Sequence, residues 1–185
     1  ICIGRNESSK ICRVAGDGHA HGDIGSGFWI GKKAIMEMAL NESSVKGDVN
    51  LSQLMTHVLD KFDSSDFNLA IEETMESEDS VPIIASLAEG IIELATSGNE
   101  MALGIIQEGT STIAEYILQL VNDLELNVND NSIILAGNGS VIRNDFYRKT
   151  LNDALQFDFP NIKWTFSDIS NAYGAGLLAG RLHDV

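Results

Sequence analysis

A glycine-rich segment near the N-terminus, residues 16–31, constrains the fold more than any other stretch of this 185-residue chain. It holds six of the 17 glycines, spaced two to four residues apart. Glycine weakens the interior of helices and strands, and its missing side chain lets the backbone approach another group closely. The segment is therefore predicted to be a loop between two regular elements.

The elements predicted on either side of this loop are a β-hairpin and a helix. Ile1–Gly4 and Ile11–Val14 are short apolar runs separated by a polar turn, which is typical of a hairpin. After the loop, Ser26 or Gly27 is predicted to cap a helix. The apolar residues of that helix recur at helical spacing, and they are Phe28, Trp29, Ile30, Ala34, Ile35 and Met38.

A helical insert is expected at about residues 41–98. Two short helices are predicted in its first part from apolar spacing. Ser80 followed by Pro82 is a strong start signal for a further helix that ends at the close of the insert. Asn99 is then predicted to cap a long helix, whose stripe of apolar residues indicates core packing.

The last third of the chain alternates predicted strands and helices. Ser132–Ala136 is a continuous apolar run, typical of a buried strand, and it leads into the glycine turn Gly137–Ser140. A helix is predicted at 144–155, a strand at 162–166 and a final helix at 172–182. The order indicates an α/β protein with a mixed sheet, built from the hairpin and the βα units.

The charge of the chain limits its partners. The formal net charge is −15, with 27 acidic and 12 basic residues, and such a surface repels nucleic acid and anionic membranes. The phosphates of a nucleotide ligand would need a local site of backbone N–H groups and Mg²⁺. Without a signal peptide or an apolar run of membrane length, a cytoplasmic location is expected.

Two loops carry candidate binding residues. Asp23 precedes the first predicted helix, and its carboxylate could bind adjacent sugar hydroxyls or, alternatively, cap the helix or satisfy loop N–H groups. Gly137–Ser140 would place backbone N–H groups at the carboxyl end of a strand, where open α/β sheets bind ligands. An ordinary β-to-α turn explains this second loop equally well, because it is neither a Walker A loop nor a full dinucleotide fingerprint.

Together these loops carry a family resemblance. Gly22–Gly31 reads Gly-Asp-x-Gly-Ser-Gly-x-Trp-Ile-Gly, which resembles the signature of the BadF/BadG/BcrA/BcrD ATPase family. That family includes N-acetylglucosamine kinase and belongs to the sugar kinase/actin/heat-shock-70 superfamily. Further similar segments follow the family's order along nearly the whole chain, at Gly4–Asn6, Gly18–His19, Ala95–Asn99, Gly137–Asn144 and Tyr173–Ala179.

The resemblance implies that residues 1–185 form the C-terminal domain of an ATP-dependent kinase of N-acetylglucosamine or a related hexose or amino sugar. Its fold would be ribonuclease-H-like, as in actin-like ATPases, with ATP and Mg²⁺ as cofactors. Asp17 and Ile24 stand where the family usually has Trp and Glu, so the sugar is left open. The matching sugar-contact positions are Gly16, Asp17, Gly18 and Asp23, and the nucleotide positions are Gly98, Gly137, Asn138, Gly139 and Ser140.

The resemblance also implies an N-terminal half outside this chain. The family's first phosphate loop, catalytic Asp and Gly-Thr-Gly-Ser loop would precede Ile1, as would the central strand of the sheet. An absent central strand leaves backbone groups unpaired, so an upstream segment is expected, covalently attached or as a partner. No catalytic residue is expected within the 185 residues, which should not transfer phosphate alone. A homodimer is left open.

Three other functions remain open from the residues. His19, His21 and Asp23 form H-x-H-x-D, whose alternate residues could ligate zinc in a hydrolase if the segment is extended. A degenerate kinase domain could bind sugar or nucleotide without catalysis. An activator ATPase with an iron–sulfur cluster is disfavoured, because Cys2 and Cys12 do not lie where a bridging cluster is expected; reduced thiols are predicted instead.

Overall fold

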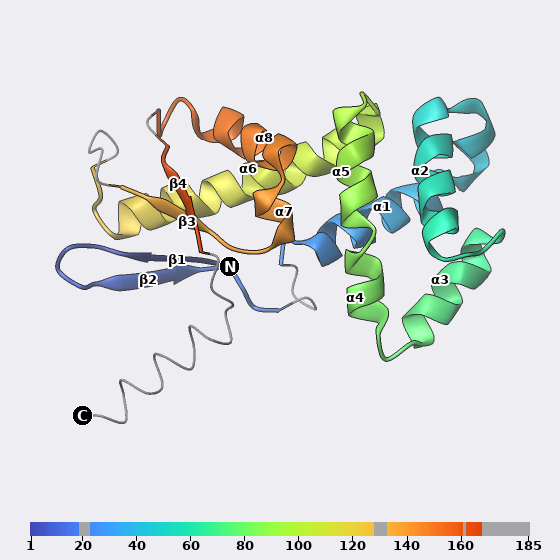
Figure 1. The fold of residues 1–185 in the computed structure, drawn as a ribbon, viewed down its shortest axis with the longest axis horizontal. Coiled ribbons are helices and arrows are strands. Elements are labelled where there is room, and N and C mark those ends of the chain that lie inside the picture. Colours follow the sequence, from blue (N-terminus) through green and yellow to red (C-terminus); the bar gives the residue numbers. More distant parts are fainter. Residues whose placement is uncertain (19–22, 128–132, 161, 168–185) are drawn as a thin grey trace.

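Helix α6, Glu100–Asp123, runs lengthwise through the molecule and carries both parts of the fold (Figure 1). The structure is a computed structural model, and it describes residues 1–18, 23–127, 133–160 and 162–167. The strands lie along the C-terminal part of α6, whereas most of the other helices gather around its N-terminal part. The chain is α/β, with mostly helices and two small sheets.

The predicted hairpin is confirmed. Strands β1 (Cys2–Arg5) and β2 (Ile11–Val14) pair antiparallel, with Cys2 opposite Val14. Alternation turns Gly4 toward α6, where an added Cβ would lie 2.5 Å from Cδ1 of Leu124. The glycine therefore lets the hairpin lie close against the C-terminal end of α6.

The second sheet is a parallel βα unit. Strands β3 (Leu135–Gly137) and β4 (Trp164–Phe166) pair in parallel, and α7 (Ser140–Arg143) and α8 (Asp145–Leu155) connect them. Helix α8 packs on α6. The predicted order of strand, glycine turn, helix and strand is confirmed, although both strands begin later than expected.

The sheet differs from the single mixed sheet that the sequence predicts. In the part of the chain that is described, the hairpin and the β3–β4 pair are separate two-stranded sheets. Cys2 of β1 and Leu135 of β3 nevertheless pack against the same apolar cluster, which α6 and α8 form. The two sheets thus pack on the same helices, but the hairpin contacts the end of α6, and no strand among the described residues links it to β3.

The helical part follows the first glycine loop. It comprises α1 (Gly27–Leu40), the 3₁₀-helix η2 (Glu42–Gly47), α2 (Val49–Lys61), α3 (Phe67–Glu76), α4 (Ser80–Ala85) and α5 (Ala88–Thr96). The single helix predicted from Ser80 onward is instead interrupted between α4 and α5. The interruption lies where α1 crosses, since Gly31 of α1 packs directly on the carbonyl group of Ile84.

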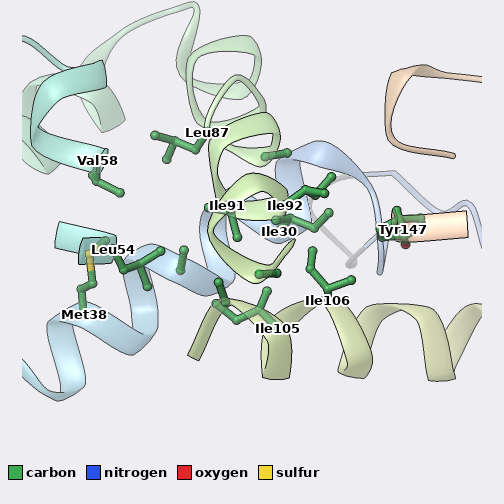
Figure 2. Packing of buried hydrophobic residues seen from close by; sticks show 14 of the residues in the cluster. Ile30, Met38, Leu54, Val58, Leu87, Ile91, Ile92, Ile105, Ile106 and Tyr147 are labelled. Atoms are coloured by element: carbon green, nitrogen blue, oxygen red, sulfur yellow. The ribbon is translucent and has the colours of Figure 1, made fainter. Parts of the chain in front are cut away.

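Local caps and a shared core hold these helices. Oδ1 of Asn99 accepts from the Ala102 N–H at 2.9 Å, so the predicted cap of α6 is confirmed. Figure 2 shows the core side chains converging from α1, α2, α5 and α6, with Tyr147 of α8 at one edge; ten are labelled: Ile30, Met38, Leu54, Val58, Leu87, Ile91, Ile92, Ile105, Ile106 and Tyr147.

No single helix in the described ranges is long and apolar enough to cross a membrane; Ser80–Thr96 and Glu100–Asp123 pass that test only as a pair bent by 114°.

Gly31→Ala should destabilise the protein, because the new methyl group would overlap the backbone carbonyl oxygen of Ile84. Overpacking of this kind costs about 1–3 kcal/mol of unfolding free energy, measured by urea denaturation. Gly104→Ala in α6 is the matched control, since nothing lies within 4 Å of its Cβ position. The control should gain about 0.5–1 kcal/mol, and equal effects of the two changes would contradict the packing described.

Candidate functional site

Asp23 lies half-buried at the end of the first glycine loop, and its side chain is not a helix cap. The cap of α1 is Ser26, whose Oγ accepts from the Trp29 N–H at 3.1 Å. Asp23 contributes only its backbone carbonyl, which accepts from the Ser26 N–H at 2.9 Å. Among the described residues its carboxylate has no hydrogen bond or ion pair, so the alternative of a capping Asp23 is wrong. No described residue therefore occupies the oxygens of the Asp23 carboxylate.

Gly25 fixes the loop that carries Asp23 against two helices. Its φ is +79°, and an added Cβ would overlap Ile113 of α6 and lie 2.6 Å from Oη of Tyr147. The Tyr147 hydroxyl donates to the Gly25 carbonyl at 3.0 Å. On α6, a Cβ at Gly109 would lie 3.2 Å from Cα of Gly25. The close contact between the loop and α6 therefore requires glycine at both Gly25 and Gly109.

The other predicted sugar-contact positions differ in exposure. Gly16 and Gly18 both have φ of +88°, but a Cβ would meet Ile1 at Gly16 and open space at Gly18. The Asp17 side chain is 78% exposed, with Oδ1 lying 3.6 Å from Nη2 of Arg13. A ligand could therefore approach the backbone at Gly18, whereas the Asp17 carboxylate lies at the surface and pairs with Arg13.

The second glycine loop divides into a buried and an open part. At Gly137 an added Cβ would lie 3.1 Å from Cδ1 of Phe166, so this glycine is required by the packing of β3 on β4. Gly139 has φ of +104° with open space at its Cβ position. Asn138 and Ser140 are exposed beside it. The open part, at Asn138–Ser140, is the surface that a ligand could contact.

Gly98 lies apart from this second loop. It is exposed in the turn between α5 and α6, with φ of +93° and its N–H donating to the Ala95 carbonyl at 3.1 Å. In Figure 1 the α5–α6 turn stands away from α7. The structure therefore does not bring Gly98 together with Gly137–Ser140, although both were predicted to line the nucleotide.

Two arginines gather beside the second loop. The guanidinium carbons of Arg143 and Arg148 lie 5.4 Å and 5.2 Å from the ring centroid of Phe166. Arg143 donates to the Ser167 carbonyl, and Arg148 pairs with Asp145. From the sequence, Arg143 stands out as a candidate nucleotide contact because it follows the second loop, with a solvated surface arginine as the alternative. Sequence reasoning missed Arg148 and Phe166, because strand β4 brings the ring to the arginines through its pairing with β3. Because Asp145 neutralises Arg148, Arg143 supplies the local positive charge here, in a chain whose net charge is −15.

Burial raises the pKa of two acidic side chains, Tyr147 and Cys2. Burial, and to a lesser extent the nearby Cys2 thiol, raises the pKa of the Tyr147 phenol. Burial likewise raises the pKa of the Cys2 thiol. The Tyr147 hydroxyl, which is protonated at neutral pH at its ordinary pKa of 10.0, thus also remains a hydrogen-bond donor to Gly25 at moderately alkaline pH.

The metal hypotheses gain no support from the geometry. Within the described ranges, no group of three or more His, Cys, Asp and Glu side chains is placed to hold a metal ion. His19 and His21 lie outside the described residues, so the predicted zinc set is not tested. Cys2 and Cys12 are free thiols, and Cys12 stands opposite Gly4 rather than Cys2.

Comparison with known proteins supports a relation to a sugar kinase. No family model matches the chain. The chain is 28% identical over 184 residues to N-acetylmuramic acid/N-acetylglucosamine kinase of Clostridium acetobutylicum. The similarity covers 97% of this chain but 57% of that protein. The chain therefore spans a little over half the length of the curated relative it matches.

Stability should fall at alkaline pH because of the two buried acids. The unfolded chain loses protons near the ordinary pKa values of 9.0 for Cys2 and 10.0 for Tyr147, before the folded chain does. Rising pH therefore favours unfolding, and the unfolding free energy should drop between about pH 8 and about pH 11. Urea denaturation across this range should show a smaller drop for the double variant Cys2→Ala, Tyr147→Phe. An unchanged drop would contradict the assignment.

Proposed function

We propose that this chain is the sugar- and nucleotide-binding part of an ATP-dependent kinase that acts on N-acetylated amino sugars. The observation that carries the proposal is the similarity to N-acetylmuramic acid/N-acetylglucosamine kinase along 97% of the chain. The free, half-buried carboxylate of Asp23 and the open second loop support it. The family is the BadF/BadG/BcrA/BcrD type, with a ribonuclease-H-like fold.

Asp23 is the proposed main contact to the sugar. Its two carboxylate oxygens can accept hydrogen bonds from adjacent hydroxyl groups of one sugar ring. Ser26 and Tyr147 bind the carbonyl groups of Asp23 and Gly25, so the backbone that carries the carboxylate is positioned before a ligand arrives. Gly18, with open space at its Cβ position, would let the sugar lie close to the backbone.

The nucleotide is proposed to lie against the open part of the second loop. Asn138, Gly139 and Ser140 are exposed there, and Arg143 and Arg148 lie beside them. Mg²⁺ and local positive charge would offset the repulsion between nucleotide phosphates and an acidic protein. Gly98 would then contribute from a separate side, in the α5–α6 turn.

In the proposed reaction, a sugar hydroxyl oxygen forms a bond to the γ-phosphorus of Mg-ATP. The bond between that phosphorus and the ADP oxygen breaks, and the hydroxyl proton passes to a general base. Transfer of this kind depends mainly on positioning and electrostatics. The proposed base lies outside this chain, in the part of the relative's length that the chain does not span.

The arrangement of the two sheets supports the proposal that the part of the protein outside this chain contributes a further strand. The inner sides of β1 and β3 share one apolar cluster, yet these strands belong to different sheets. One additional extended segment between them would join the hairpin and β3–β4 into a mixed sheet. Strand addition would also pair the exposed backbone edges of both.

Asp23→Asn should weaken sugar binding while leaving nucleotide binding nearly intact. Hydrogen bonds to a charged group contribute about 1.5–3 kcal/mol, so the dissociation constant should rise at least about tenfold. Calorimetric titration with N-acetylglucosamine, N-acetylmuramic acid and ADP measures this. Glu7→Gln, an exposed change in the hairpin turn, is the charge-matched control.

Equal loss of sugar and ADP binding by folded Asp23→Asn would contradict this division of roles. Sugar binding that equals the wild type would remove Asp23 from the site. Tight binding of both ligands by the full-length protein without turnover would favour the non-catalytic alternative.

Gly139→Ala should weaken ADP binding more than sugar binding. The backbone at Gly139, with φ of +104° and ψ of 161°, is a conformation that alanine adopts only with strain. Such strain costs about 1–3 kcal/mol, which the second loop would relieve by moving. Gly47→Ala is the control, because nothing lies within 4 Å of its Cβ position and its φ is not in the left-handed region. ADP affinity that is equal in both variants would exclude this loop from the nucleotide site.

A further inference from the structure

One buried hydrogen bond links the elements that carry the two glycine loops. The Tyr147 hydroxyl of α8 donates to the Gly25 carbonyl at 3.0 Å, and the Tyr147 side chain is 1% exposed. Gly25 lies two residues after Asp23. Tyr147 lies seven residues after Ser140, in the first turns of α8. The bond therefore joins the proposed sugar loop to the helix that follows the proposed nucleotide loop.

The Tyr147 end of this bond is fixed by the second loop's own structure. Gly139 is the N-cap residue of α7, and Asn144 follows as the N-cap residue of α8. Oδ1 of Asn144 accepts from the Tyr147 N–H at 3.1 Å. A capped helix start holds its first turn in one orientation. The phenol thus has a fixed position relative to Gly139 and Ser140.

The Gly25 end is fixed by contact with α6. Ile113 fills the space where a Cβ would lie, and Gly109 lets the loop backbone approach the helix. The next residue, Ser26, caps α1, and its N–H donates to the Asp23 carbonyl at 2.9 Å, which closes a tight turn over Asp23–Ser26. Because this hydrogen bond closes the turn that contains Gly25, a movement of the Gly25 carbonyl would be passed on to the backbone of Asp23.

We propose that Tyr147 is a positioning residue, which holds the Gly25 carbonyl so that the Asp23 carboxylate keeps a fixed place relative to the nucleotide loop. This inference rests on the proposed function. The hydrogen bond from the Tyr147 hydroxyl to the Gly25 carbonyl is buried, so it restrains the loop without either group touching a ligand. Since both loops are tied to one side chain, sugar and nucleotide should also raise each other's affinity by the same factor.

Tyr147→Phe tests the inference, because it removes the hydroxyl and keeps the ring in the core. Sugar affinity should fall about fivefold, which equals about 1 kcal/mol at 1.4 kcal/mol per tenfold, with a smaller change for ADP. Each ligand should also be titrated with and without the other present. The factor by which N-acetylglucosamine and ADP raise each other's affinity should fall toward one in Tyr147→Phe. Ile113→Val is the matched control, since it alters a side chain that touches Gly25 but leaves the hydrogen bond intact.

A purely structural role predicts a different pattern. Tyr147→Phe would then lower the melting temperature while both affinities stay unchanged, or fall in parallel as with Ile113→Val, and either result would overturn the proposal. Amide hydrogen exchange without ligands separates this from failure of the proposed function. If the wild-type protein binds neither N-acetylglucosamine nor ADP, faster exchange of the Gly25 and Ser26 amides in Tyr147→Phe would still support positioning, and unchanged exchange would refute it.

Discussion

The close packing of the first glycine loop on α6 is the contact on which the rest of the structure depends. Gly25 and Gly109 lie so near each other that a side chain on either would displace the loop. This contact sets where α1 begins, and α1 leads into the helices around the N-terminal part of α6. It also places the loop beside Tyr147 of α8, which follows the second loop. The loop at Gly25 and helix α8, which lie far apart in the sequence, thereby contact each other and both pack on α6.

Local signals predicted the elements well, because their causes lie within a few residues. The caps at Ser26 and Asn99 are single side chains that bind the N–H groups of the next turn. The break between α4 and α5 could not be predicted in this way, since it lies where Gly31 of a different helix packs on Ile84. The separation of the two sheets among the described residues could not be predicted from local signals either, because strand pairing joins segments far apart in the sequence.

The candidate site was predictable in its residue types but not in their roles. Asp23 emerged from the sequence as either a cap or a ligand, and only the geometry shows that Ser26 makes the cap. Gly137 and Gly139 look alike in sequence, yet Phe166 requires one and the other faces open space. Tyr147 could not be found at all, because its partner is 122 residues away in the chain.

The most direct test of this account is an NMR map of the backbone amides during separate titrations with N-acetylglucosamine and ADP. The account predicts that the sugar shifts the amides of Gly18, Asp23 and Gly25, and that ADP shifts those of Gly139 and Ser140. Shifts from both ligands that centre on the helices between α2 and α5, with these loop amides unchanged, would contradict it.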